Sequence, residues 1–260
     1  MQLLAGAEPI FYRGSETGCL CLHGFMAAPT QMRWMGQHLA AQGYTVYCPR
    51  LAGHGIDPRL ISHLRWEDYY ASVLDGYHLL RQQCEHIFVF GLSMGGTLAL
   101  LLASQMEVTA IGVMASPVQF DSRLMPHANW VRFFKPYNFY PTPLELNEKI
   151  KAEQAQRGEP IIGQVRYELW SVAAINQLYK LVQTTYTKLP AVNVPLLLIY
   201  SEKDDVVSHD NCELIANRVG SQHVEKHYLK KSGHILTQDD ERQTVLQLAA
   251  EFVHSVCANL

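Results

Sequence analysis

Short runs of consecutive apolar residues recur along the chain. Two of them, 18–22 and 87–90, end abruptly at turns that contain glycine, and similar runs stand at 45–47, 111–114 and 196–200. A continuous apolar run, without alternating polar residues, is typical of a strand in a parallel sheet that is covered on both faces. We therefore expect these runs to be strands of one mostly parallel sheet.

Segments with helical spacing lie between and after these runs. Residues 31–42 and 66–83 place apolar side chains on one helical face, and residues 96–105 are rich in alanine and leucine. Charged or amphipathic helical patterns follow at 144–157 and 171–188. Alternation of strands and helices predicts an α/β fold, with a sheet flanked by helices and right-handed crossovers.

The segment from Gln119 to Leu189 breaks this rhythm. Within it, Pro126–Pro143 holds four prolines and six aromatic residues, a composition that suits neither a regular strand nor a helix. An insertion of about 70 residues is too long for a simple crossover, and long insertions in compact domains are usually functional lids. We therefore predict a core of residues 1–118 and 190–260 and a cap of residues 119–189. The alternative is an extra helical layer without substrate contact.

Composition narrows the class of protein. The chain has 260 residues, of which 48% are hydrophobic, and this argues against intrinsic disorder. The net charge is −3 and no basic run could neutralise a row of phosphates, so we expect no nucleic-acid partner. No stretch approaches the roughly 20 apolar residues of a membrane span, and the N-terminus lacks the pattern of a signal peptide. We expect no stable membrane insertion, and the oligomeric state stays open.

The cysteines fit no metal site. None of the six forms a CxxC motif, and their spacing is unlike that of zinc fingers or ribbons. In a chain of this length they are interpreted as reduced thiols, which favours a cytoplasmic location. We expect no metal and no cofactor.

The strongest chemical signal is the pentapeptide Gly91-Leu92-Ser93-Met94-Gly95. It directly follows one predicted strand and opens a predicted helix, which is the context that a nucleophile elbow requires. Small residues on either side of Ser93 let strand and helix approach closely. The alternative is a chance match in a glycine-rich loop.

A serine needs a base and an orienting carboxylate to become a nucleophile, in the chain order Ser, acid, His. Asp204 and Asp205 follow the predicted strand 196–200, and either could be the acid. His234 stands 30 residues beyond Asp204 in a loop beside Gly233, which suits a base. Other downstream histidines, in helical or strand-like surroundings, are interpreted as surface or packing residues: His223, His227 and His254.

An oxyanion hole requires a second backbone donor from an early strand–helix loop. His23-Gly24-Phe25 closes the strand 18–22 and suits this role. The backbone N–H groups of Phe25 and Met94 are the two candidate donors, and we expect His23 to brace the loop by hydrogen bonding.

These residues belong to longer motifs, namely His23-Gly24-Phe25, Arg50-Leu51-Ala52-Gly53-His54-Gly55, Gly91-Leu92-Ser93-Met94-Gly95-Gly96, Asp204 with Val207, and Ser232-Gly233-His234. Together they resemble the bacterial monoacylglycerol lipases and closely related carboxylesterases, from about Gly18 to Phe252.

The resemblance implies an α/β-hydrolase fold and a triad of Ser93, Asp204 and His234, with Asp204 rather than Asp205 as the acid. It also implies that Phe25 and Met94 donate to the oxyanion. The expected substrate is a small-molecule ester, a monoacylglycerol or a medium-chain acyl ester. In that family a polar residue of the cap recognises the glycerol hydroxyls. The region 164–168 of this sequence corresponds to that part of the cap, and no single residue in it is identified.

Other functions remain open at this point. A general carboxylesterase, a thioesterase, an amidase or a carbon–carbon hydrolase would use the same triad, because the pocket sets the leaving group. A non-catalytic ligand receptor on the same fold is a further class. Such a protein could lack a triad member, whereas all three candidates are present in this sequence. The aromatic stretch Pro126–Pro143 would line an acyl tunnel or pack the cap.

Overall fold

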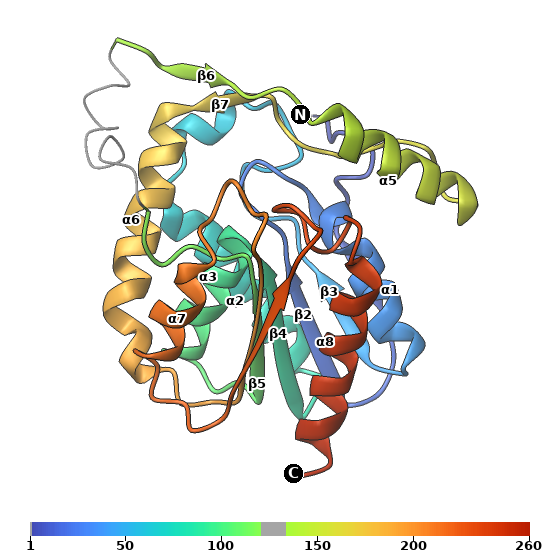
Figure 1. Cartoon of the computed structure of the whole chain (residues 1–260), viewed down its shortest axis with the longest axis vertical. Helices are drawn as coiled ribbons and strands as arrows, with labels where there is room; N and C mark the ends of the chain where they lie inside the picture. Colours follow the sequence, from blue (N-terminus) through green and yellow to red (C-terminus); the bar gives the residue numbers. More distant parts are fainter. Residues whose placement is uncertain (1, 121–133) are drawn as a thin grey trace.

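The computed structural model describes residues 2–120 and 134–260, and a mixed but mainly parallel sheet forms its centre (Figure 1). The sheet has seven strands in the order β1-β3-β2-β4-β5-β8-β9. Every neighbouring pair is parallel except β1 and β3 at one edge. The strands are β1 (Ile10–Tyr12), β2 (Thr17–Leu22), β3 (Thr45–Cys48), β4 (His86–Leu92), β5 (Ala110–Met114), β8 (Leu196–Ser201) and β9 (Val224–Leu229). All five predicted strands are confirmed.

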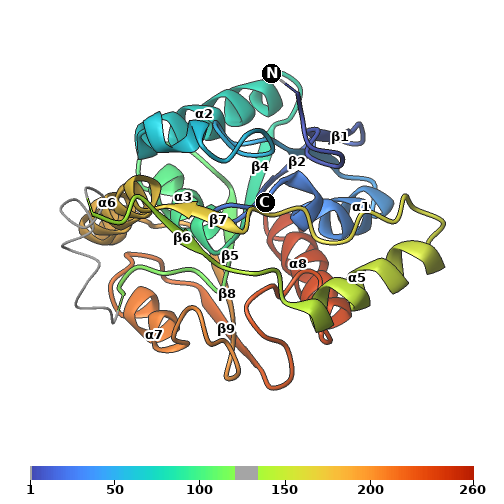
Figure 2. The same ribbon diagram turned by 90° about the horizontal axis from the view of Figure 1, so that it is seen from above.

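Helices cover both faces of the sheet (Figure 2). Helices α1 (Arg33–Ala41) and α8 (Arg242–Cys257) pack on one face, whereas α2 (Trp66–Arg81), α3 (Met94–Ala103) and α6 (Val172–Lys188) pack on the other. Alternate residues of each central strand point to opposite faces. In β2, Leu20 and Leu22 join one buried cluster, and Cys19 and Cys21 join the other. This double burial explains the uninterrupted apolar runs and confirms a parallel sheet covered on both sides.

Shorter elements complete the fold. They are α5 (Leu144–Gln156), α7 (Asp210–Ala216), the strands β6 (Tyr137–Phe139) and β7 (Leu169–Ser171), and the 3₁₀ turns Pro29–Met32, Leu60–His63 and Leu189–Ala191. All six cysteines are free thiols. Within the described part of the chain, no helix combines the length and the apolar character needed to cross a membrane.

The inserted segment lies mostly above the carboxyl ends of the strands (Figure 1). Strands β6 and β7 pair in antiparallel fashion, and α5 lies beside them at the top of the molecule. Helix α6 then descends and packs against α2 and α3. Residues 126–133 of the aromatic stretch fall outside the described residues, and the assignment of 119–189 as a cap stays a prediction.

Candidate active site

Ser93 stands at the sharp turn between β4 and α3. Its backbone has φ 56° and ψ −122°, and its N–H donates to Met114 O at 2.8 Å. A Cβ on Gly91 would collide with the carbonyl group of Gly95, and a Cβ on Gly95 would collide with Leu22 O. Strand and helix therefore approach so closely that only glycine fits at both positions, which agrees with the predicted nucleophile elbow.

The structure brings Ser93, His234 and Asp204 together. Imidazole Nδ1–H donates to Asp204 Oδ2 at 2.8 Å, which leaves Nε2 to accept from Ser93 Oγ–H at 3.0 Å. The Asp204 side chain is fully buried, and its Oδ1 accepts from Val206 N and from the next backbone N–H, both at 2.9 Å. Asp205, the rival acid, is exposed, and it is Asp204 that receives the bond from His234.

The two candidate oxyanion donors lie in segments next to the nucleophile. Met94 opens α3, so its N–H belongs to the first turn, which has no intrahelical partner and carries the positive end of the helix dipole. The loop with Phe25 comes close to the nucleophile, because a Cβ on Gly24 would lie 3.3 Å from Ser93 Cβ. Neither Phe25 N–H nor Met94 N–H donates to another described residue. Both N–H groups therefore stay candidates for the oxyanion hole.

Side chains behind the loop hold it in place. Gly24 N–H donates to Gln31 Oε1 at 2.7 Å. His23 Nδ1–H donates to Gly24 O at 2.9 Å, and its Nε2 accepts from Leu51 N–H at 3.2 Å. Burial lowers the pKa of His23 to about 3, with neighbouring His54 as the next cause. His23 is therefore neutral at physiological pH and braces the loop, as the sequence predicts.

Residues of the inserted segment reach this loop. The Trp170 ring meets the Phe25 ring edge-on, with 5.4 Å between centroids. Tyr167 N–H donates to Met26 O at 2.9 Å, and the Tyr167 hydroxyl accepts from Ile56 N–H at 2.6 Å. Tyr167 and Trp170 were not predicted from the sequence, and the only signal for them was the position of Tyr167 inside the region 164–168. These contacts join the inserted segment to the loops around Ser93.

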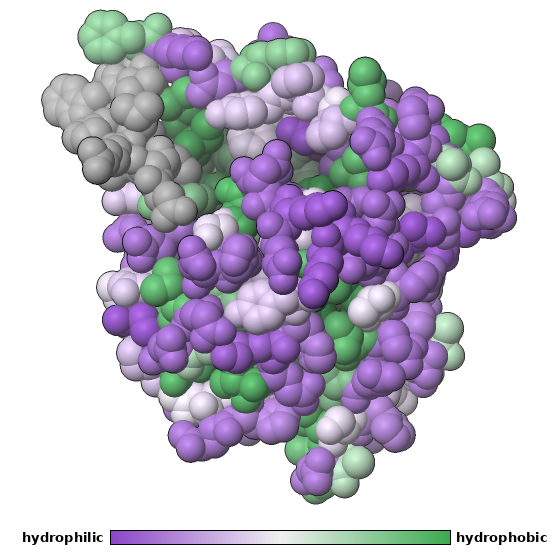
Figure 3. Space-filling model, viewed as in Figure 1, coloured by the Kyte–Doolittle hydropathy of each residue, from purple (hydrophilic) through white to green (hydrophobic). Residues whose placement is uncertain are grey.

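Exposed apolar side chains gather on the inserted segment. Figure 3 shows apolar surface at the top of the molecule, over β6 and around α5. The largest exposures there belong to Phe134, Leu144, Phe139 and Ile161. Among the described residues, no group of three or more His, Cys, Asp or Glu side chains is arranged to hold a metal ion.

Comparisons with known proteins agree with this geometry. The family described as serine aminopeptidase, S33 matches residues 15–241. A thermostable monoacylglycerol lipase from Bacillus sp. (strain H-257) is 31% identical over 96% of this chain and 95% of that protein. A carboxylesterase from Bacillus subtilis (strain 168) is 25% identical over 96% of this chain and 97% of that protein.

A solved structure reported for LipS and LipT, two metagenome-derived lipolytic enzymes, has a TM-score of 0.87 and 31% identity. It covers 98% of this chain and 100% of that chain. The predicted α/β-hydrolase fold is thus confirmed, and so is the resemblance carried by the sequence motifs.

Proposed function

We propose, from the premise that this chain belongs to the serine aminopeptidase S33 family of α/β-hydrolases, that it cleaves monoacylglycerols or related medium-chain acyl esters through a serine nucleophile. The chain is a hydrolase of the lipase and esterase type. The observation that carries the finer proposal is the chain of hydrogen bonds from Asp204 through His234 to Ser93.

In the proposed reaction, Ser93 Oγ attacks the ester carbonyl while His234 Nε2 takes its proton. Asp204 holds the imidazole in the required tautomer and stabilises the cation that forms. The N–H groups of Phe25 and Met94 would bind the oxyanion, and each such donor is worth about 3 kcal/mol of transition-state stabilisation. His234 then gives the proton to the leaving alcohol, and the same base activates water to release the acyl group. No metal or cofactor enters this proposal.

The choice of substrate rests on two kinds of support. The relatives include a monoacylglycerol lipase and a carboxylesterase. Residues of the segment 119–189, which we propose as a cap, contact the Phe25 loop through Trp170 and Tyr167. The exposed apolar side chains of the inserted segment favour an acyl chain in the substrate. The hydrogen bonds that join all three triad candidates favour an enzyme over a ligand receptor. The free thiols also fit a cytoplasmic location.

The triad is tested by single variants. Ser93→Ala, His234→Ala and Asp204→Asn should each lower kcat by several orders of magnitude, and the losses should not add, because the three residues act as a unit. Asp205→Asn is the matched control and should retain activity. A fluorophosphonate probe should label Ser93 alone. Labelling of another serine would refute the assignment of the nucleophile, and a larger loss in Asp205→Asn than in Asp204→Asn would refute that of the acid.

The proposed substrate is tested with esters whose acyl chains increase in length, each acid being offered as a monoacylglycerol and as a methyl ester. Since each buried methylene contributes roughly 0.8 kcal/mol, kcat/KM should rise with acyl length and level off where the pocket ends. A monoacylglycerol should exceed the methyl ester of the same acid, because an unpaired buried polar group costs about 1–3 kcal/mol when the glycerol hydroxyls are missing. Equal kcat/KM for the two esters would leave the alternative, a general carboxylesterase.

A further inference from the structure

The loop that presents His234 is held by a carboxylate from the segment before α8. Glu241 Oε2 accepts from the backbone N–H groups of Lys231 and Ser232, both at 2.8 Å, and Glu241 Oε1 accepts from Lys230 N–H at 3.2 Å. The Ser232 hydroxyl donates to Glu241 Oε2 at 3.1 Å and accepts from Glu241 N–H at 2.9 Å. One side chain thus binds three consecutive backbone N–H groups of the loop.

A second carboxylate continues this series. Asp239 Oδ2 accepts from Gly233 N–H at 2.7 Å. Because β9 ends at Leu229, the ladder of the sheet offers no acceptor to the backbone N–H groups of the loop that follows, although the Ser201 hydroxyl at the end of β8 donates to Ser232 O. The four residues before His234 therefore have their N–H groups bound by Glu241 and Asp239, so these two carboxylates hold the stretch of backbone that leads into His234.

The hydrogen bonds that the Glu241 carboxylate accepts are strong. Its burial raises the pKa of the carboxyl group, but the hydrogen bonds from the backbone of Ser232, Lys231 and Lys230 and from the Ser232 hydroxyl outweigh burial, so the pKa lies below its ordinary value. The carboxylate is therefore ionised at neutral pH. Hydrogen bonds to an ionised acceptor are about twice as strong as neutral ones.

The outer side of the same segment binds helix α5. Lys149 Nζ lies 3.0 Å from Asp240 Oδ1 and 3.8 Å from Asp239 Oδ1. Arg242 also forms an ion pair with Glu153 of α5. Asp239 thus touches both α5 and the loop of His234, which ties this part of the loop to the inserted segment as well as to the core.

We propose that Glu241 and Asp239 are positioning residues of the reaction, acting through the backbone of residues 230–233 to hold the His234 imidazole between Ser93 and Asp204. The inference rests on the proposed function, because it assigns a role within that triad. Neither carboxylate touches the reacting atoms.

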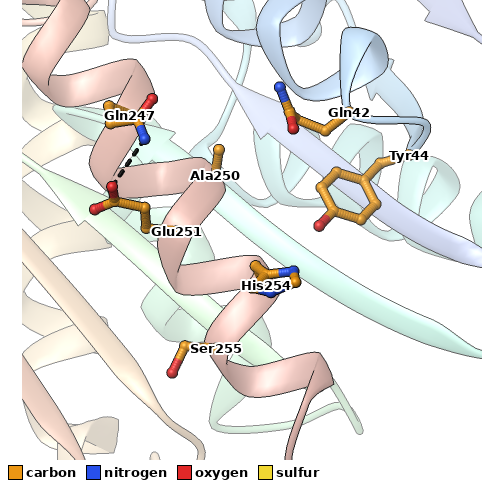
Figure 4. A pocket seen from close by; sticks show the side chains of 7 residues that line it. All are labelled: Gln42, Tyr44, Gln247, Ala250, Glu251, His254 and Ser255. Carbon is orange, nitrogen blue, oxygen red and sulfur yellow. Dashed lines mark hydrogen bonds between the residues drawn. The ribbon is translucent and has the colours of Figure 1, made fainter.

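The test compares a substitution just before α8 with one inside that helix. Glu241→Gln keeps the shape of the side chain but loses the charge, and it replaces one acceptor oxygen with an N–H2 group that faces backbone N–H groups. Glu251→Gln is the matched control. Glu251 lies on α8 beside a depression at the other end of the helix, where it accepts from Gln247 Nε2 at 2.8 Å (Figure 4).

We expect Glu241→Gln to lower kcat by about 10- to 100-fold with KM within twofold, since a shift of about 1 Å in a catalytic group can cost 100-fold in rate. Asp239→Asn keeps a carbonyl oxygen for Gly233 N–H, so it should lose less than Asp239→Ala. Glu251→Gln should leave kcat unchanged. All variants are assayed well below their melting temperatures.

A proton NMR measurement separates positioning from general destabilisation. The Nδ1–H proton of His234, bound to Asp204, should give a low-field signal that disappears in His234→Ala. We expect Glu241→Gln to broaden or lose this signal, and Glu251→Gln to retain it.

An unchanged signal together with unchanged kcat in Glu241→Gln would overturn the proposal. So would a fall in melting temperature alone, with kcat and the signal both retained. If the parent protein hydrolyses no ester, the proposed function fails. The NMR comparison then still decides whether Glu241 positions His234.

Discussion

The backbone of Ser93 is strained, and the strain can be measured. Its φ of 56° with ψ of −122° is a region that residues with a Cβ rarely adopt and that glycine adopts readily. The turn is kept in this state by Ser93 N–H, which donates to Met114 O, and by Ser93 O, which accepts from Gly96 N–H at 3.0 Å and from Thr97 N–H at 3.2 Å. Ser93→Gly should relieve the strain, whereas Ser93→Ala should keep it.

The magnitude follows from two opposing contributions. A residue held in a sparsely populated region costs on the order of 1–3 kcal/mol, and this is released when the Cβ is removed. Glycine loses more conformational freedom on folding, which costs roughly 0.5–1 kcal/mol. We therefore expect Ser93→Gly to be more stable than Ser93→Ala by about 1 kcal/mol, or roughly 2–4 °C in melting temperature for a chain of this size.

The comparison isolates the backbone, because both variants lose the same hydrogen bond between Ser93 Oγ and His234 Nε2. Urea denaturation with equal m-values gives the difference in free energy of unfolding, and both variants should be inactive towards esters. If Ser93→Gly is no more stable than Ser93→Ala, the turn is not strained and the reasoning is wrong.

Two further perturbations concern stability. Burial lowers the pKa of His54 from 6.5 to about 4, so below pH 6.5 the unfolded chain takes up a proton that the folded chain does not. Between pH 7 and pH 5 this should remove about 2 kcal/mol of the free energy of unfolding. In His54→Gln that loss should be absent, whereas the exposed His254→Gln should keep it; equal pH dependence in both would contradict the assignment. Tyr167→Phe should cost about 1–3 kcal/mol, because it leaves the buried Ile56 N–H without an acceptor. Tyr179→Phe is the control, because the Tyr179 hydroxyl forms no hydrogen bond with another described residue, and it should cost less. Equal free energies of unfolding for Tyr167→Phe and Tyr179→Phe would refute the role of the bond from Ile56 N–H to the Tyr167 hydroxyl.

The sequence predicts the centre of the sheet better than its edge. Runs such as Ile87–Phe90 are recognisable because both faces of the strand are buried. Strand β9 was missed because it lies at the edge, where Glu225, Lys226 and His227 leave no continuous apolar run. Helix α8 was not predicted either, although its buried Val245, Ala249 and Val253 have helical spacing.

Within the candidate site, the side chains that we propose to react were easier to find than those that we propose to position them. Ser93, Asp204 and His234 stand in short motifs at the ends of strands, and the parallel sheet brings those ends to one edge. Glu241 lies in a charged run before a helix, where a carboxylate is ordinary. No local pattern distinguishes a carboxylate that binds distant backbone N–H groups, because those contacts depend on how β9 and α8 meet.

The two halves of the site are also joined to each other through one residue. Gln31 Oε1 accepts from Gly24 N–H of the Phe25 loop at 2.7 Å, and Gln31 O accepts from the Thr237 hydroxyl, three residues beyond His234, also at 2.7 Å. Gln31 is buried, so neither bond competes with solvent. A displacement of the Gln31 backbone would therefore shift the Phe25 loop and the loop of His234 together. The donors that would bind the oxyanion and the base that would move the proton thus share one support.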